Sequence, residues 1–175
     1  MKICSILAFS AVLALVATAH GQALSALDKA FVEKAAKANL EEIEVGKLAS
    51  QKASDPQLKG FADQMVTDHS KANENLKPIA DAGGVAWPAR LTGESKELYD
   101  RLSKLSGSAF DKAFVRAMVE GHQKVANEYK MESTKAKDSK LKSYVQQTLP
   151  TVQEHLSHAQ QLQHPSKSAS AQKSS

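Results

Sequence analysis

The chain has 175 residues, of which 42% are hydrophobic, and it carries 23 Lys and Arg against 19 Asp and Glu. A chain of this length can form one domain with a substantial core. Nucleic-acid binding is not expected, because a nucleic-acid reader shows clustered arginines with stacking aromatics, whereas Arg90, Arg101 and Arg116 are the only arginines and are scattered.

The first 23 residues follow the pattern of a secretory signal peptide. Lys2 precedes an apolar run from Ile3 to Val16, and small residues follow that run. Two cleavage sites of the small-x-small type are present, so the mature chain is expected to begin at His20 or Leu24.

Cys4, the single cysteine, lies inside this expected signal peptide. The mature chain should therefore have no disulfides and no thiolate ligands, which suits a bacterial periplasmic or secreted protein. No later segment approaches the roughly 18 consecutive apolar residues of a transmembrane helix, so no transmembrane segment is expected.

The rest of the chain is rich in Ala, Lys, Glu, Gln, Leu and Ser and lacks strand-like alternation, which favours an all-α fold. Ser54-Asp55-Pro56 gives an N-cap followed by proline, and Gly83-Gly84 is a stop signal. Ser108 or Asp111 can cap a third long helix, and Asp138 marks the start of a fourth. The expected long helices are about 26–53, 56–82, 111–136 and 139–163, with a short helix at 94–106 and a disordered polar tail at 163–175.

An internal repeat supports this division. DKAFV occurs at 28–32 and at 111–115, and DPQLK at 55–59 returns as DSKLK at 138–142, so both pairs are displaced by 83 positions. Two related helical hairpins are therefore expected to pack into a four-helix bundle over residues 24–162, because neither hairpin can bury its apolar face alone.

Each expected helix carries one strongly polar side chain on its inward face. These side chains are Glu42, His69, His122 and His155. At 1.5 Å per residue, they lie about 18 to 27 Å from the turns that join the two hairpins, in helices roughly 40 Å long. All four are therefore expected near mid-depth, in one layer of the bundle core.

Three neutral imidazoles and one carboxylate are a suitable set for a divalent transition metal, such as Zn, Fe, Mn or Cu. A buried Glu42 without a partner would cost several kcal/mol, so it needs a cation, a charged histidine or a shared proton. A metal-free alternative stays open, in which Glu42 and one protonated histidine form a buried ion pair that specifies register. The protein would then be a structural or interaction module of the cell envelope, with lysine-rich faces on anionic membrane surfaces.

Three segments closely resemble a bacterial exported family, the domain of unknown function 4142. They are EVGKLASQKASDPQLKGFADQMVTDHSKAN, SGSAFDKAFVRAMVEGH and LKSYVQQTLPTVQEHLSHA. The resemblance implies a ferritin-like four-helix bundle and a family often labelled as outer-membrane protein, without an established activity. The polar residues that recur in the family match Glu44, His69, Asp111, His122 and His155. Glu44 lies off the inward face, so Glu42 and Glu44 both stay candidates for the first helix.

The chain contains no Glu-x-x-His sequence, whereas di-iron enzymes of the ferritin-like superfamily use two. Ferroxidase or oxygen-activating chemistry is therefore disfavoured. Nor does the sequence contain a nucleophile triad, a phosphate loop or a Gly-rich nucleotide motif. The leading hypothesis is an exported protein that binds one transition metal and acts in metal handling or stress tolerance, rather than an enzyme.

Overall fold

The computed structural model describes residues 23–164, and this part of the chain is all-helical, without strands. Except for Ala23, the expected signal peptide lies outside the described residues, as does the tail from residue 165 onward. The helices are α1 (Ala26–Lys52), α2 (Pro56–Gly83), α3 (Gly93–Ser103), α4 (Gly107–Lys135) and α5 (Ser139–Gln163). None of these helices has the length and apolar character that crossing a membrane requires.

Aspartate caps fix the start of α2 and of α5. Asp55 accepts a hydrogen bond from the Gln57 backbone N–H, and Pro56 occupies the first helical position. Asp138 accepts from the Leu141 N–H at 2.8 Å. Such caps satisfy N–H groups that have no partner within the helix. Both caps confirm the predicted helix starts, and they occupy equivalent positions of the repeat.

The third long helix begins earlier than predicted. α4 starts at Gly107, and its N-cap is Ser106, which makes no side-chain capping bond. The prediction that Ser108 or Asp111 caps this helix is therefore wrong. The Asp111 carboxylate instead accepts hydrogen bonds from the backbone N–H and the hydroxyl of Ser54. It ties the first turns of α4 to the connection between α1 and α2.

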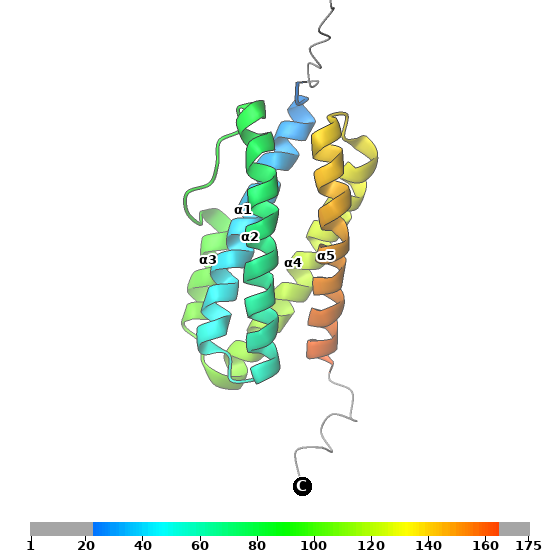
Figure 1. Cartoon of the computed structure of the whole chain (residues 1–175). Coiled ribbons are helices and arrows are strands. Elements are labelled where there is room, and N and C mark those ends of the chain that lie inside the picture. The colour runs from blue at the N-terminus through cyan, green and yellow to red at the C-terminus, as the bar shows by residue number, and fades with distance from the viewer. Residues whose placement is uncertain (1–22, 165–175) are drawn as a thin grey trace, which may run out of the picture.

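The four long helices form two antiparallel hairpins, α1 with α2 and α4 with α5, which lie side by side (Figure 1). Gly84 ends α2 in the left-handed region at φ 66°. The chain then returns along the length of the domain, with α3 beside α1, and α4 begins at the end where α2 also begins. The connection between the two hairpins therefore runs lengthwise along the bundle (Figure 1).

Close packing within the first hairpin depends on Gly46. A Cβ at this position would lie 2.8 Å from Val66 Cγ2 and 3.2 Å from the Ala62 carbonyl oxygen. The absence of a side chain therefore lets the last turns of α1 approach the first turns of α2.

The core consists of two apolar clusters. The cluster at the α1–α2 turn is built around Phe61, Met65, Phe110, Phe114 and Met118. The cluster at the opposite end is built around the following residues: Phe31, Leu76, Tyr129, Leu141, Tyr144 and Val145. Each large apolar side chain contributes about 1.5–3 kcal/mol when it is fully buried. The buried polar residues between these clusters are members of neither, so they interrupt the apolar core. They are Asn39, Glu42, His69, His122 and His155.

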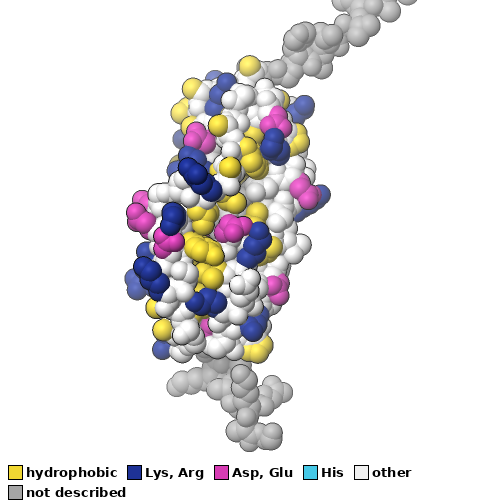
Figure 2. All heavy atoms as spheres, turned by 90° about the vertical axis from the view of Figure 1, so that its left-hand side faces the viewer, with side chains coloured by type: hydrophobic (Ala, Val, Ile, Leu, Met, Phe, Trp, Pro, Cys, Tyr) yellow, Lys and Arg dark blue, Asp and Glu magenta, His cyan; other side chains and the backbone are white. Residues whose placement is uncertain are grey.

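Charged side chains of both signs are mixed over the molecular face shown in Figure 2. Several exposed pairs stand one helical turn apart, as Lys37 does with Glu33 and Arg116 with Glu120. Exposed pairs of this kind contribute roughly 0.3–0.5 kcal/mol each. Pairs this weak leave most of the stability to the core.

Candidate metal centre

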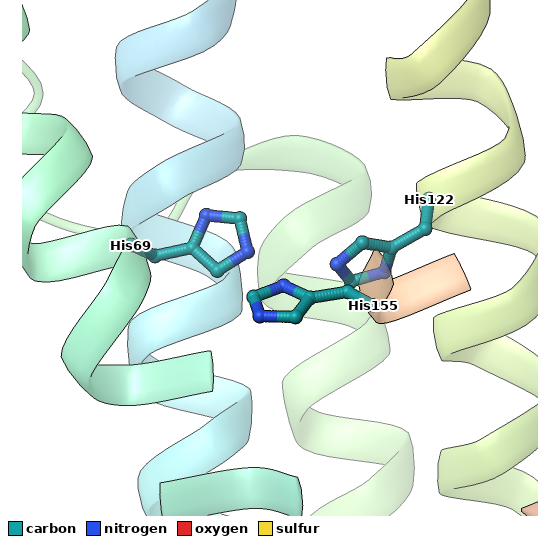
Figure 3. A group of neighbouring side chains, drawn as sticks. All are labelled: His69, His122 and His155. Carbon is teal, nitrogen blue, oxygen red and sulfur yellow. The ribbon is translucent and has the colours of Figure 1, made fainter. Parts of the chain in front are cut away.

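Three histidines from three helices meet in the core. His69 comes from α2, His122 from α4 and His155 from α5, and at most 4% of each residue is exposed. One ring nitrogen from each lies within 4.8 Å of the other two, and Figure 3 shows each ring turning a nitrogen toward its neighbours. We call these three residues the histidine layer.

Asn39 of α1 orients the His69 ring. The Asn39 side-chain N–H groups donate to Asn73 Oδ1 at 3.0 Å and to the Tyr144 hydroxyl at 3.4 Å, which fixes the orientation of its amide. The amide oxygen then lies 3.0 Å from His69 Nδ1. Because this oxygen can only accept, Nδ1 carries the proton and Nε2 carries the lone pair.

The other two rings are oriented in the same manner. His122 Nδ1 lies 2.9 Å from the Met118 carbonyl oxygen, one turn earlier on α4. His155 Nε2 lies 2.9 Å from a carboxylate oxygen of Asp68 on α2. Both oxygens are acceptors, so these ring nitrogens donate, and in the neutral form of each ring the second nitrogen carries a lone pair.

The remaining nitrogens have no hydrogen-bond partner within residues 23–164. They are His69 Nε2, His122 Nε2 and His155 Nδ1. A buried polar atom left unpaired costs about 1–3 kcal/mol, and most buried polar groups find a partner. Three ring nitrogens without a hydrogen-bond partner therefore converge from three helices, as the ligand atoms of a metal centre do.

Burial keeps the His69 and His122 rings in the neutral form that a metal requires. Desolvation lowers the pKa of His69 well below its usual 6.5, and the neighbouring His122 and His155 rings lower it further. Desolvation and His155 likewise lower the pKa of His122 to about 4. Near neutral pH these two rings are therefore uncharged, and no proton competes with a metal for their lone pairs.

Glu42 is buried beside the layer but outside the set of mutually close nitrogens. Its Oε1 lies 3.7 Å from His122 Nδ1, the nitrogen that bonds to the backbone, and its Oε2 has no partner among the described residues. Desolvation, with a smaller contribution from the Glu41 charge, raises the pKa of Glu42 to about 8. Near neutral pH both side chains are neutral, so this contact is not an ion pair.

Glu44, Asp111 and His158 lie outside the layer. Glu44 is on the surface, where its carboxylate pairs with Lys47 Nζ at 2.8 Å, so Glu42 is the glutamate of α1 that faces the core. Asp111 holds the α1–α2 connection. His158 packs against Phe61, with 4.8 Å between the ring centroids.

Asn39 was not predicted, because the inward face of each expected helix was assigned one strongly polar residue, and that of the first helix was Glu42. The repeat could have revealed it, since Asn39 precedes His122 by the same 83 positions that separate the two repeat copies. Asp68 directly precedes His69 in the sequence, yet its carboxylate bonds to His155 on another helix. No local pattern indicates that pairing.

The family model described as domain of unknown function (DUF4142) matches residues 14–162, which include nearly all of the described helices. The chain belongs to the DUF4142 family. This confirms the resemblance seen in the sequence. No curated protein matches the chain significantly.

Solved structures of other proteins share the fold of this DUF4142 chain. A DUF305 fragment from Deinococcus radiodurans has a TM-score of 0.72 at 11% identity, covering 81% of this chain and 98% of its own. CopM in the Cu(I)-bound form has a TM-score of 0.65 at 18% identity, covering 76% and 92%. CopM in the Cu(II)-bound form has a TM-score of 0.66 at 18% identity, covering 77% and 94%. At these identities the likeness shows the fold alone.

The residues of this DUF4142 layer fit a transition-metal ion. Zn–N bonds of about 2.0–2.1 Å at tetrahedral angles place ligand nitrogens about 3.4 Å apart. The three nitrogens, within 4.8 Å of one another, would need to close by a small rotation of the rings. The partners on the opposite ring nitrogens are those that orient histidine ligands in metalloproteins, namely a carboxylate, a backbone carbonyl and an amide.

Proposed function

We propose that this DUF4142 protein binds one transition-metal ion through His69 Nε2, His122 Nε2 and His155 Nδ1. The observation that carries the proposal is the convergence of three buried imidazole nitrogens that lack hydrogen-bond partners among the described residues. A metal ion would remove the cost of leaving all three unpaired. The metal-free alternative, a buried ion pair between Glu42 and a protonated histidine, is less favoured, because burial raises the pKa of Glu42 to about 8 and lowers the pKa of His122 to about 4. Near neutral pH these two groups are therefore both uncharged.

Copper is the ion that the donor set supports best. Imidazole suits Zn, Cu, Fe and Ni, and among divalent first-row ions affinity for such sites is highest for Cu. Three neutral nitrogens beside a protonated Glu42 bring no negative charge, so a monovalent ion would leave less uncompensated charge in the core than a divalent one. CopM, which shares the fold, is known in Cu(I)-, Cu(II)- and Ag-bound forms, and this supports the same choice.

Metal binding fits this site better than catalysis. The three nitrogens are buried, and Glu42 is the only glutamate close to them in the described core. Di-iron centres of ferritin-like enzymes require several carboxylates. We infer a ferritin-like bundle, with one lengthwise connection, that holds a single ion. A signal peptide at residues 1–23 would direct the protein to the periplasm, where it would act in metal handling or stress tolerance.

The test is the metal content of the exported protein, purified without chelator or His tag. After equilibration with Cu(I) under reducing conditions, or with Zn, Fe or Mn, we expect one equivalent of one metal, copper. His69→Ala and His122→Ala should each lose it, whereas His164→Ala, which changes an exposed histidine, should keep it. Absence of any metal in the wild type, with a melting temperature indifferent to all four ions, would refute the proposal.

A further inference from the structure

The histidine layer needs a route for its ion, because less than a twentieth of each ring residue is exposed. A pocket of about 910 Å³ opens between α2, α4 and α5 at the end of the domain where α5 stops. Its wall includes Leu58 and Phe61 from α2, Val115 from α4 and His158 from α5. Leu58, Phe61 and Val115 belong to the apolar cluster at the α1–α2 turn. The pocket therefore reaches this cluster, which contacts the layer through Phe61 and His155.

Phe61 separates the pocket from the layer. Its ring lines the pocket and contacts His158 with the centroids 4.8 Å apart, and it also contacts His155 at 6.0 Å with the ring planes nearly perpendicular. Only 1% of Phe61 is exposed. His158 follows His155 by one helical turn, a rise of about 4.5 Å along α5. One aromatic ring thus stands between a histidine at the pocket wall and a histidine of the layer.

Two carboxylates and one arginine of the pocket wall are already engaged, and Lys112 is a cation without a lone pair for a metal. Asp55 caps α2, and Asp111 accepts hydrogen bonds from Ser54. Arg116 pairs with Glu120 at 2.9 Å. His164 also lines the pocket, but it is exposed just after the end of α5. The half-buried imidazole of His158, which packs against Phe61, is therefore the group best placed to ligate an ion inside the pocket.

Other approaches to the layer are less suitable. Asp68, whose side chain is 32% exposed, contacts His155 at Nε2, and this nitrogen carries the proton. An ion arriving there would meet an N–H group and not a lone pair. A second pocket lies between α1 and α4 around Leu27 and Met131. Its lining includes no histidine of the layer, nor does it include Phe61, the ring that contacts His155.

We propose that the pocket at the end of α5 is the entrance for the metal ion, with His158 as the first ligand and Phe61 as the gate to the layer. The inference rests on the proposed function. The transfer is a ligand exchange, in which the bond from the ion to His158 breaks as bonds to the layer nitrogens form, and it moves neither electrons nor protons. His158 contributes to the rate of loading and not to the final affinity.

Loading kinetics test the entrance. Cu(I), delivered as its coloured bicinchoninate complex, is mixed with wild type, His158→Ala, Phe61→Leu and the control Gln153→Ala on the exposed face of α5. We expect His158→Ala to load several-fold more slowly to the wild-type stoichiometry, and Phe61→Leu to load and release several-fold faster. Equal rates in wild type and His158→Ala, or slowing in Asp68→Asn alone, would overturn the proposal.

A second measurement does not depend on metal. Deuterium exchange at the imidazole C2 position reports the access of water to each ring in the chelator-treated protein. We expect faster exchange at His155 in Phe61→Leu, with Phe61→Met as the substitute if that variant does not fold. Unchanged His155 exchange would refute the entrance even if copper binds. Faster exchange in a protein that binds no metal would uphold the route into the core and refute the proposed function alone.

Discussion

The substitution Glu42→Gln tests the electrostatics of the layer most directly. Glu42 is 4% exposed, and burial raises the pKa of its carboxyl from 4.5 to about 8. Gln has nearly the same shape and stays neutral at every pH. The free energy of unfolding of the Glu42→Gln variant therefore lacks the pH-dependent contribution that the ionisation of Glu42 makes in the wild type.

The sign follows from the direction of the shift. Because the folded-state pKa of Glu42 is raised, the wild type has its full stability below the unfolded-state value of 4.5 and loses stability as the pH rises toward 8. At about 1.4 kcal/mol per pKa unit, the whole loss is about 5 kcal/mol. In metal-free protein, Glu42→Gln should match the wild type near pH 4.5 and exceed its stability by an amount approaching this figure above pH 8.

Urea unfolding at a series of pH values gives the difference between the two proteins. The two proteins differ only in this carboxyl group, so the pH dependence of the difference in unfolding free energy reports its ionisation. Glu44→Gln is the matched control, because it changes the same side chain two residues away on the surface and removes an exposed ion pair worth no more than about 0.5 kcal/mol. Parallel profiles for wild type and Glu42→Gln would refute the reasoning, since they would show that the carboxyl ionises as easily in the folded protein as in the unfolded chain.

Three further outcomes are expected. Asn39→Ala removes the acceptor of the His69 Nδ1 proton, so metal affinity measured by chelator competition should fall about 10- to 100-fold. Asp68→Ala should weaken binding in the same assay more than Asp68→Asn, because the asparagine oxygen can still accept from His155 Nε2. The lowered pKa of His122 makes its contribution to metal-free stability complete above pH 6.5 and lost as the pH falls toward 4, by about 3 kcal/mol. In urea unfolding, the stability of the wild type relative to His122→Gln should therefore fall by this amount across that range, since His69 is present in both proteins.

Local sequence was sufficient for those features that local physics determines. The caps at Asp55 and Asp138 follow from hydrogen bonds within one turn, and the spacing of His69, His122 and His155 on inward faces follows from helical periodicity. The common depth of the histidines follows from counting residues from the two hairpin turns. The all-helical class and the buried layer were therefore predictable.

Tertiary partners were not predictable from the sequence. The Asp111 carboxylate has the appearance of a helix cap, yet it bonds to Ser54, which lies 57 positions away. The pairing of Asp68 with His155 spans 87 positions. Short polar side chains can satisfy a nearby backbone or a distant group equally well, and the assembled fold decides between them.

The layer is chemically asymmetric although the two hairpins are related, because equivalent positions of the repeat carry different residues. Asn39 and His122 are equivalent positions, but Asn39 orients a ring and His122 offers a lone pair. His69 corresponds to Val152, which is buried and apolar. The duplication therefore supplies the two hairpin frames, and the individual substitutions within them supply the three donors.

The unpaired groups of the layer also couple metal binding to stability. Four buried atoms, the three ring nitrogens and Glu42 Oε2, lack hydrogen bonds among the described residues, and each costs about 1–3 kcal/mol. The two apolar clusters must offset that cost in the metal-free protein. An ion that binds only the folded state raises the free energy of unfolding by RT ln(1 + [L]/Kd), where [L] is the concentration of free ion. This is about 4 kcal/mol when [L] is a thousand times Kd. The rise in unfolding free energy with free Cu(I) should therefore give the same Kd as direct chelator competition, and disagreement between the two would place copper on the unfolded chain or on the surface instead of in the layer.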